Sequence, residues 1–221
     1  IGLAKDMDNR LEQLLLFAQG RLLQSGGGAA DDYVASVLKA LSMTPPGKDV
    51  GRVAMLNVAL SQAYAWAGLL EQGLAASDAA LLGMASIDQF DREFIDFSIE
   101  LWALGIRARL LIRMNRLDDA RVCLQQMLSS DEMLGDPVIR QITHHLHVEF
   151  ADITQNSALA LEHAAIVVNL AQQYASPYSK VFALWCAGRA EASAGNLAAA
   201  QQGFSEALEY IASTKVAVEF E

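Results

Sequence analysis

Residues 184–208, LWCAGRAEASAGNLAAAQQGFSEAL, decide the fold. Gly195 and Asn196 separate two segments that have the residue pattern of helices. Glycine ends a helix at little cost because it adopts positive φ without a steric clash. The stretch therefore predicts a helical hairpin, with a first helix over about 178–194 and a second helix over about 197–212.

The same pattern recurs along the chain with a period of forty residues. Ala120, Ala160 and Ala200 occupy one register position, and each lies within a helical pattern. Small residues at such positions allow two antiparallel helices to approach closely, while larger residues fill the grooves between them. One hairpin cannot bury its apolar face alone, whereas stacked hairpins bury a continuous core.

The other hairpins are marked by their turns. These turns fall at the glycines of 26–28, at Gly68, at Asn115 and around Gln155. Asparagine is the non-glycine residue best suited to a left-handed helix cap. The second and third hairpins are offset by forty-seven residues, which predicts a longer linker over 84–93.

These patterns predict an all-α fold, a solenoid of about five antiparallel helix pairs that forms a single domain over 1–221. The hairpins are predicted at about 5–44, 51–84, 94–130, 137–173 and 178–212. The chain starts without methionine and stops in helix-like sequence, so we expect a fragment of a larger protein.

Composition narrows the possible partners and the location. Twenty-six acidic against sixteen basic residues give a net charge of −10, which opposes binding to nucleic acid or to an anionic membrane. Cys123 and Cys186 have no metal-binding or disulfide-framework spacing, so we expect inert buried thiols. The sequence has neither an apolar run that could span a bilayer nor a signal-type start. We therefore expect a cytoplasmic location.

One unit resembles a known repeat. Its matching residues are Leu184, Gly188, Gly195, Ala200, Phe204 and Ala207, which together resemble the tetratricopeptide repeat signature. Glu191 replaces the aromatic residue usual in that signature, and Ala108 and Val148 replace the glycine in two other units. The resemblance implies a right-handed superhelical solenoid.

A wider resemblance covers about residues 50–221. The forty-residue period and the stretch 172–196, QQYASPYSKVFALWCAGRAEASAGN, resemble the helical region of MalT-like transcription activators and of large bacterial signalling ATPases with nucleotide cyclase domains. In those families the repeats sense an inducer or a partner protein and follow a nucleotide-binding switch domain. This chain has no G-x-x-x-x-G-K-[ST] loop, so any ATPase function of a parent protein lies outside it.

A histidine cluster and two pairs of aspartates are the candidates for metal binding and for acid and base catalysis. His144, His145 and His147 precede His163 in the fourth hairpin, but no nearby cysteine completes a tight site, so we expect no metal. The pairs 118–119 and 31–32 are aspartates at helix starts, where negative charge favours the exposed amides, so we expect them to cap the helices rather than to act in catalysis. Neither cysteine has a persuasive histidine and carboxylate around it, so we expect no enzyme and no cofactor.

The concave face formed by the first helices is the better candidate for a binding site. Counting from the small-residue positions places aromatic and charged residues on this face. These predicted groove residues are Gln62, Trp66, Trp102, Arg109, Arg113, His145, Glu149, Asp152, Trp185 and Arg189. Tryptophan and arginine are enriched at binding hot spots, although tryptophan at helical spacing is also a common core residue.

We therefore expect a regulatory binding module of a cytoplasmic signalling or transcription regulator. Its groove would take a protein segment or a small inducer and relay occupancy to a switch, ATPase or output domain of the same parent chain. The alternative is a scaffold that self-associates into a homo-oligomer through the apolar edges of the array. Neither hypothesis requires binding to nucleic acid or to a membrane by this segment.

Overall fold

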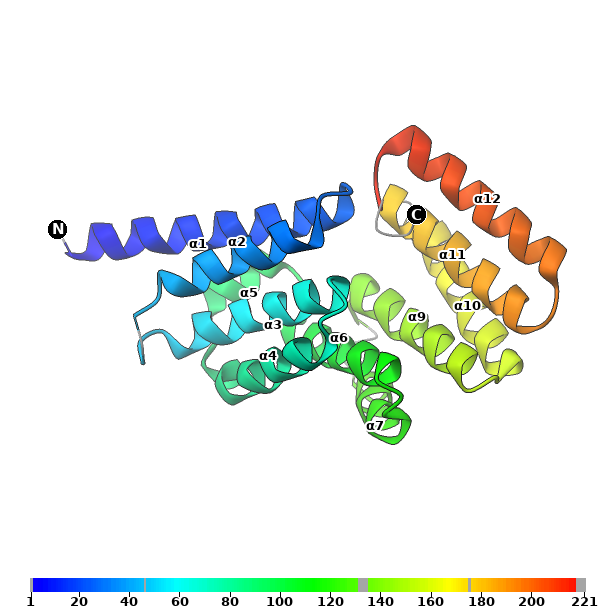
Figure 1. Cartoon of the computed structure of the whole chain (residues 1–221), viewed down its shortest axis with the longest axis horizontal. Coiled ribbons are helices and arrows are strands. Elements are labelled where there is room, and N and C mark those ends of the chain that lie inside the picture. The colour runs from blue at the N-terminus through cyan, green and yellow to red at the C-terminus, as the bar shows by residue number, and fades with distance from the viewer. Residues whose placement is uncertain (1, 46, 131–134, 175, 218–221) are drawn as a thin grey trace. The chain divides into compact units, whose positions relative to one another are not determined.

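The computed structural model describes residues 2–45, 47–130, 135–174 and 176–217. Within these ranges the chain forms eleven α-helices, one short 3-10 helix and no strand, which confirms the all-α prediction. Figure 1 shows the helices, and adjacent helices pack in pairs. The helices also divide into two compact units, residues 1–110 and 111–221. The single array over 1–221 stays a prediction.

Five helix pairs account for most of the chain. They are α1 (Gly2–Ser25) with α2 (Ala30–Ser42), α3 (Val50–Trp66) with α4 (Leu70–Gly83), α6 (Ile99–Arg113) with α7 (Leu117–Leu128), α9 (Pro137–Ile153) with α10 (Ser157–Gln173), and α11 (Pro177–Ser193) with α12 (Leu197–Thr214). The first helices of successive pairs end 41, 47, 40 and 40 residues apart. The predicted spacing, including the longer step in the middle, is therefore present in the helix ends.

Every pair turns in the same way. The residue two positions after the end of each first helix has positive φ, and these residues are Gly27, Gly68, Asn115, Gln155 and Gly195. Glycine takes this conformation freely and asparagine takes it at modest cost, so the predicted cap at Asn115 is confirmed. One left-handed residue then lets the second helix begin within three residues.

Close approach within a pair depends on small residues. A Cβ on Gly188 would lie 2.7 Å from the ring of Phe204, so only glycine lets α11 and α12 approach this closely. In the second pair Ser61 occupies the same position, and its hydroxyl donates a 2.8 Å hydrogen bond to the Gly73 carbonyl. The small-residue positions found in the sequence are therefore the contact points of the helices.

Unit 1 contains α1 to α5 and most of α6. In it α2 lies against both α1 and α3, and α3 lies against α4. The longer connection predicted over 84–93 is present, and it contains a 3-10 helix (η1, Met84–Ser86) and the start of a short helix α5 (Gln89–Ile95) that the sequence does not predict. A Cβ on Gly51 would clash with the Ser86 backbone, which shows how closely η1 approaches α3.

Unit 2 contains α7 and α9 to α12. Helix α10 lies against both α9 and α11, and α11 lies against α9 and α12 (Figure 1). The core between these helices consists mainly of small side chains, among them Ala151, Ala160, Ala164, Ala183 and Ala190. This alternation, in which each second helix contacts the next first helix, is the packing expected of a helical repeat.

Candidate functional site

Helices α9 and α11 position most of the predicted groove residues of unit 2. Both helices have a side-chain cap and a proline at the first helical position, where its missing N–H costs nothing. The Asp136 carboxylate accepts from the Val138 amide at the start of α9. The Ser176 hydroxyl accepts from the Ser179 amide at the start of α11. These caps fix the residue at which each of the two helices begins.

His145 is the centre of the buried layer of this site. Its Nε2 lies 2.9 Å from Glu149 Oε1, one turn further along α9. Its ring stacks on Phe182 at 4.1 Å and on Trp185 at 5.0 Å between centroids. His145 is fully buried and Glu149 nearly so, which places both predicted groove residues inside the contact between α9 and α11.

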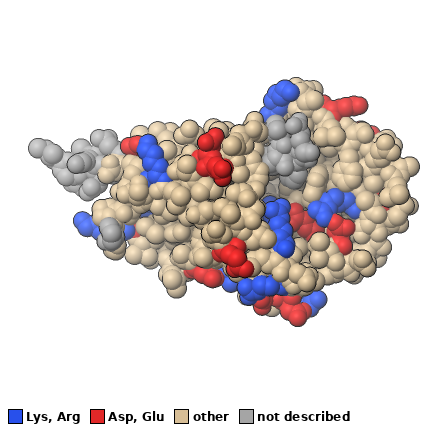
Figure 2. Space-filling model, viewed as in Figure 1, with Lys and Arg blue, Asp and Glu red and all other residues tan. Residues whose placement is uncertain are grey.

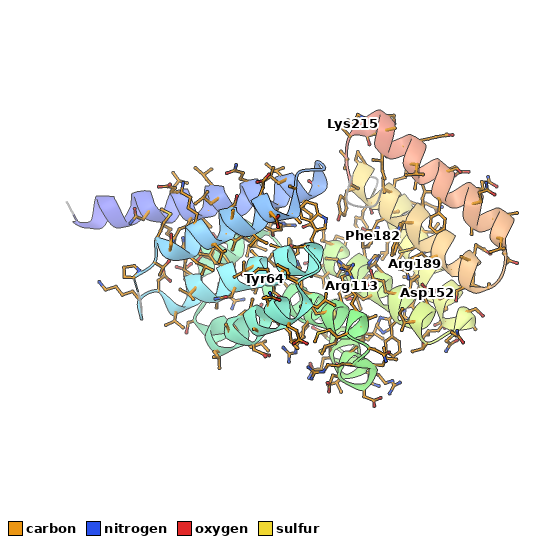
Figure 3. The ribbon with its side chains drawn as sticks, viewed as in Figure 1. Tyr64, Arg113, Asp152, Phe182, Arg189 and Lys215 are labelled. Atoms are coloured by element: carbon orange, nitrogen blue, oxygen red, sulfur yellow. The ribbon has the colours of Figure 1, made fainter. Side chains whose placement is uncertain are left out.

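Trp185, Arg189 and Asp152 form the outer layer. The Arg189 guanidinium lies over the Trp185 ring at 4.7 Å and makes an ion pair with Asp152 of α9. Figure 3 shows Arg189 and Asp152 meeting between the two helices. The side chains of Arg189 and Asp152 are 26% and 31% exposed, so solvent reaches both charges. We name Asp152, Trp185 and Arg189 the α9–α11 face.

Cys186 completes a hydrogen-bonded relay with His145 and Glu149 that is not predicted from the sequence. Its Sγ lies 3.4 Å from His145 Nδ1. The Glu149 carboxylate favours a proton on Nε2, and in the tautomer that carries its proton there Nδ1 accepts from the thiol. The expectation that neither cysteine has such surroundings was therefore wrong. It failed because Cys186 and His145 are 41 residues apart and meet only through contact between two pairs.

The relay has the hydrogen-bond order of a nucleophile, a base and a carboxylate. A catalytic thiol must also reach its substrate, and Cys186 has 0% exposure. In this structure the three groups instead form a closed polar link between α9 and α11. Both cysteines are buried, as predicted.

Three other histidines form a second buried cluster between α9 and α10. His144 Nδ1 lies 2.8 Å from His163 Nδ1, so one ring donates to the other. The His147 ring stacks on His163 at 4.4 Å, and its Nδ1 donates to the Thr143 carbonyl. Because His147 and His163 stack face to face, their nitrogens do not converge on one point. No group of three metal ligands with suitable geometry exists among the described residues.

Burial keeps this cluster neutral. It lowers the pKa of His144 to about 4 and the pKa of His163 to about 3. His147 lowers both pKa values further, His144 also lowers the pKa of His163, and Arg140 also lowers the pKa of His144. Burial likewise lowers the pKa of His147, against the hydrogen bond to Thr143. All three rings are therefore uncharged at neutral pH.

The predicted groove residues of unit 1 fall into separate surroundings. Trp102 is 3% exposed and packs edge-on against Phe17 and Phe97, so it belongs to the core. Gln62 accepts from the Tyr33 hydroxyl at 3.3 Å, and Trp66 lies 6.5 Å from the Tyr33 ring. Arg109 is partly exposed, and Arg113, at the start of unit 2, is exposed. Described contacts therefore join five of the ten predicted residues, all of them on α9 and α11.

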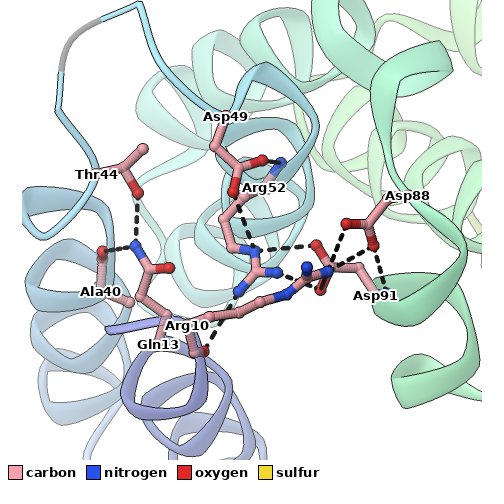
Figure 4. A network of polar contacts seen from close by, with 8 residues as sticks. All are labelled: Arg10, Gln13, Ala40, Thr44, Asp49, Arg52, Asp88 and Asp91. Atoms are coloured by element: carbon pink, nitrogen blue, oxygen red, sulfur yellow. Dashed lines mark hydrogen bonds and ion pairs between the residues drawn. The ribbon is translucent and has the colours of Figure 1, made fainter. Parts of the chain in front are cut away.

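A buried ion network in unit 1 was not predicted. Arg52 on α3 donates to Asp91 on α5 through Nε at 2.9 Å and Nη2 at 2.6 Å, and both side chains are inaccessible to solvent. Arg10 on α1 pairs with Asp88 and Asp91 (Figure 4). The network ties α5 to α1 and α3. It was missed because the segment that carries both aspartates was taken for a linker.

The aspartate pairs lie where the sequence placed them. Asp31 and Asp32 are in the first turn of α2, and Asp118 and Asp119 are in the first turn of α7. Asp118 pairs with Arg121 and Asp119 with Arg116, and neither helix has a side-chain cap. The expectation that these aspartates cap the two helices was therefore wrong, and their contribution is negative charge near the helix start.

Charged side chains lie in small mixed groups on the face drawn in Figure 2, among uncharged residues. The described helices include none that is long and apolar enough to cross a membrane. No family model, curated protein or solved structure matches this chain.

Proposed function

We propose that this chain is a non-catalytic binding module that takes a segment of a partner protein on the α9–α11 face. One observation carries the proposal. Asp152, Trp185 and Arg189 come from two neighbouring first helices, contact one another and remain partly exposed. An aromatic ring with an arginine on its face is a common binding hot spot. Such a surface suits an apolar side chain flanked by a charge.

The buried layer supports this surface from below. His145 stacks on Trp185 and is held by Glu149 and Cys186, so the indole has a fixed backing. A preorganised surface loses less conformational entropy when it binds. A carboxylate of the partner would pair with Arg189, and a basic group would pair with Asp152, in place of the ion pair between these two residues. No charge would then be buried without a counter-charge.

The wider role follows from the resemblance to MalT-like activators and signalling ATPases. We infer a right-handed superhelical repeat region of a cytoplasmic regulator, in which binding of a protein segment or a small inducer is relayed to a switch or output domain. The test is selection of peptides from a displayed random library, followed by calorimetric titration. The triple variant Asp152→Ala, Trp185→Ala, Arg189→Ala should lose at least about tenfold in affinity.

A matched control exists in the same unit. Arg116 and Asp119 form an exposed ion pair at the start of α7 and share no described contact with the residues of the α9–α11 face. The double variant Arg116→Ala, Asp119→Ala should bind the selected peptides with unchanged affinity. Equal affinity of the triple variant and the control would refute the proposal. A second candidate function, self-association, is favoured by exposed leucines on α1.

A further inference from the structure

A row of stacked rings extends the α9–α11 face toward the start of α11. The Tyr178 ring stacks on Phe182 at 6.0 Å between centroids, and Phe182 stacks on His145 of α9 at 4.1 Å. His145 also stacks on Trp185 at 5.0 Å, and the Trp185 ring carries the Arg189 guanidinium. Phe182 and Arg189 lie on the side of α11 that faces α9 (Figure 3). We name Tyr178, Phe182, His145 and Trp185 the aromatic row.

The two ends of the aromatic row reach solvent. Tyr178 is 38% exposed and Trp185 is partly exposed, whereas Phe182 and His145 between them are buried. The stacking of Phe182 on His145 fixes the row in the contact between α9 and α11, and the chain contains both of these helices. The row is therefore an aromatic surface that two helix pairs support from below.

The spacing of the two exposed rings indicates what they could bind. Tyr178 and Trp185 are seven residues apart on one helix, which separates them by about 10.5 Å along its axis. A polyproline II segment advances about 3.1 Å per residue, so the prolines of a P-x-x-P motif are about 9.3 Å apart. Proteins that recognise such segments do so with aromatic side chains. The two rings are therefore spaced to receive two prolines from successive turns of one polyproline II helix.

A helical partner fits the aromatic row less well. An amphipathic helix buries an apolar stripe at least about 100° wide and needs apolar side chains across that width. The aromatic row is narrow, and the α9 side chains that contact its members and Arg189 include the carboxylates of Glu149 and Asp152. A polyproline II segment is narrower than an α-helix and is extended before it binds, so it loses less conformational entropy.

Charge indicates which residue should accompany the prolines. Asp152 lies at the Trp185 end of the row, where it pairs with Arg189 and is 31% exposed. The whole chain carries a net charge of −10, so it attracts basic segments. A carboxylate has two oxygens and can accept from two cations. A basic residue of the partner can therefore share Asp152 with Arg189, while Arg189 stays on the Trp185 ring.

We propose, as a refinement that rests on the binding function proposed above, that the partner segment is proline-rich and binds as a polyproline II helix. Two prolines of a P-x-x-P motif pack on Tyr178 and Trp185, and a basic residue beside the motif pairs with Asp152. Tyr178 thereby joins the α9–α11 face as a residue that contacts the partner.

Fluorescence anisotropy of labelled synthetic peptides with the full chain tests the proposal. One probe contains two P-x-x-P units followed by an arginine, and a second has the arginine before them, so that both chain directions are covered. At least one probe should bind saturably below about 1 mM. The same peptide with alanine in place of every proline should bind at least about tenfold more weakly.

Two variants test the assigned contacts. Tyr178→Ala should weaken binding of the proline peptide by at least about tenfold. Tyr64→Ala is the matched control, because Tyr64 is a partly exposed tyrosine of α3 in the other unit, and it should leave binding unchanged. Asp152→Asn should weaken binding of the arginine peptide by about twofold to fivefold and leave binding of a peptide with alanine in place of the arginine unchanged. Helical circular dichroism would show that each variant is folded.

Three results would overturn the proposal. They are the absence of saturable binding of both probes below about 1 mM, equal affinity for the proline and alanine peptides, and binding that Tyr178→Ala leaves unchanged. None of these results would refute the proposed binding of a partner segment, which depends on library-selected peptides and the triple variant. Selected peptides that bind the α9–α11 face but contain no proline would leave that function in place and exclude the polyproline II partner.

Discussion

At the scale of single residues, unit 2 contains four buried histidines, three on α9 and one on α10. Their surroundings differ. His145 bridges Glu149 and Cys186, whereas His144, His147 and His163 contact mainly one another. The first group is a hydrogen-bonded link between helix pairs, and the second is a buried cluster that must stay neutral.

The three-histidine cluster makes stability depend on pH. Its folded pKa values are lowered below the ordinary value of 6.5, so the unfolded chain binds more protons between about pH 4 and 6.5. The free energy of unfolding should therefore fall as pH drops through this window, by up to about 1.4 kcal/mol per pH unit for each histidine. Urea unfolding at a series of pH values measures it.

The variant His163→Asn provides the comparison, since it removes the group with the lowest pKa in the cluster. Its free energy of unfolding should vary less steeply between pH 4.5 and 6.5, by about one histidine's share. Parallel pH profiles for the variant and the wild type would show that the cluster is not the source of the dependence.

At the scale of elements, the turns were the most predictable feature. The turns can be located from the sequence alone at Gly68, Asn115 and Gly195, because glycine and asparagine are the residue types that favour the left-handed conformation. Gln155 also has positive φ, but glutamine is not a residue type that indicates this conformation. Its turn could be located only from the forty-residue period. Helix α5 was missed because seven residues carry too little periodicity to distinguish a helix from a linker.

Glycine at position 155 should stabilise the protein, because positive φ is strained for a residue that has a Cβ. Replacing Gln155 with glycine should raise the free energy of unfolding by about 0.5–1 kcal/mol. The matched control is Gln125→Gly, since Gln125 is an exposed residue inside α7 and glycine there should cost about 1 kcal/mol. Chemical denaturation of both variants gives the comparison, and destabilisation of both by the same amount would contradict the turn assignment.

The buried pair of Arg52 and Asp91 anchors α5 to α3. Removing one partner leaves a buried charge without compensation, so Asp91→Leu should lower the free energy of unfolding by about 3–5 kcal/mol. Asp78→Leu is the control, because Asp78 is an exposed partner of Arg107 in the same unit and its loss should cost below about 1 kcal/mol. Similar losses in both variants would mean that the network does not hold α5.

At the scale of the whole molecule, the repeat explains both what the sequence predicted and what it missed. Equivalent positions on α9 and α11 are forty residues apart, so His145 and Trp185 could be paired by counting. Trp102 on α6 was predicted to line the same face, yet Phe17 and Phe97 bury it in unit 1. Counting gives a residue's position on its helix, but not which other segments cover it.

The central claim is that first helices, and not second helices, carry the binding surface. Hydrogen exchange of the chain with and without a library-selected peptide tests it most directly. Bound peptide should slow exchange in α9 and α11 and leave α7 and α12 unchanged. Slower exchange confined to α12, or no change in α9 and α11 at saturating peptide, would contradict the account.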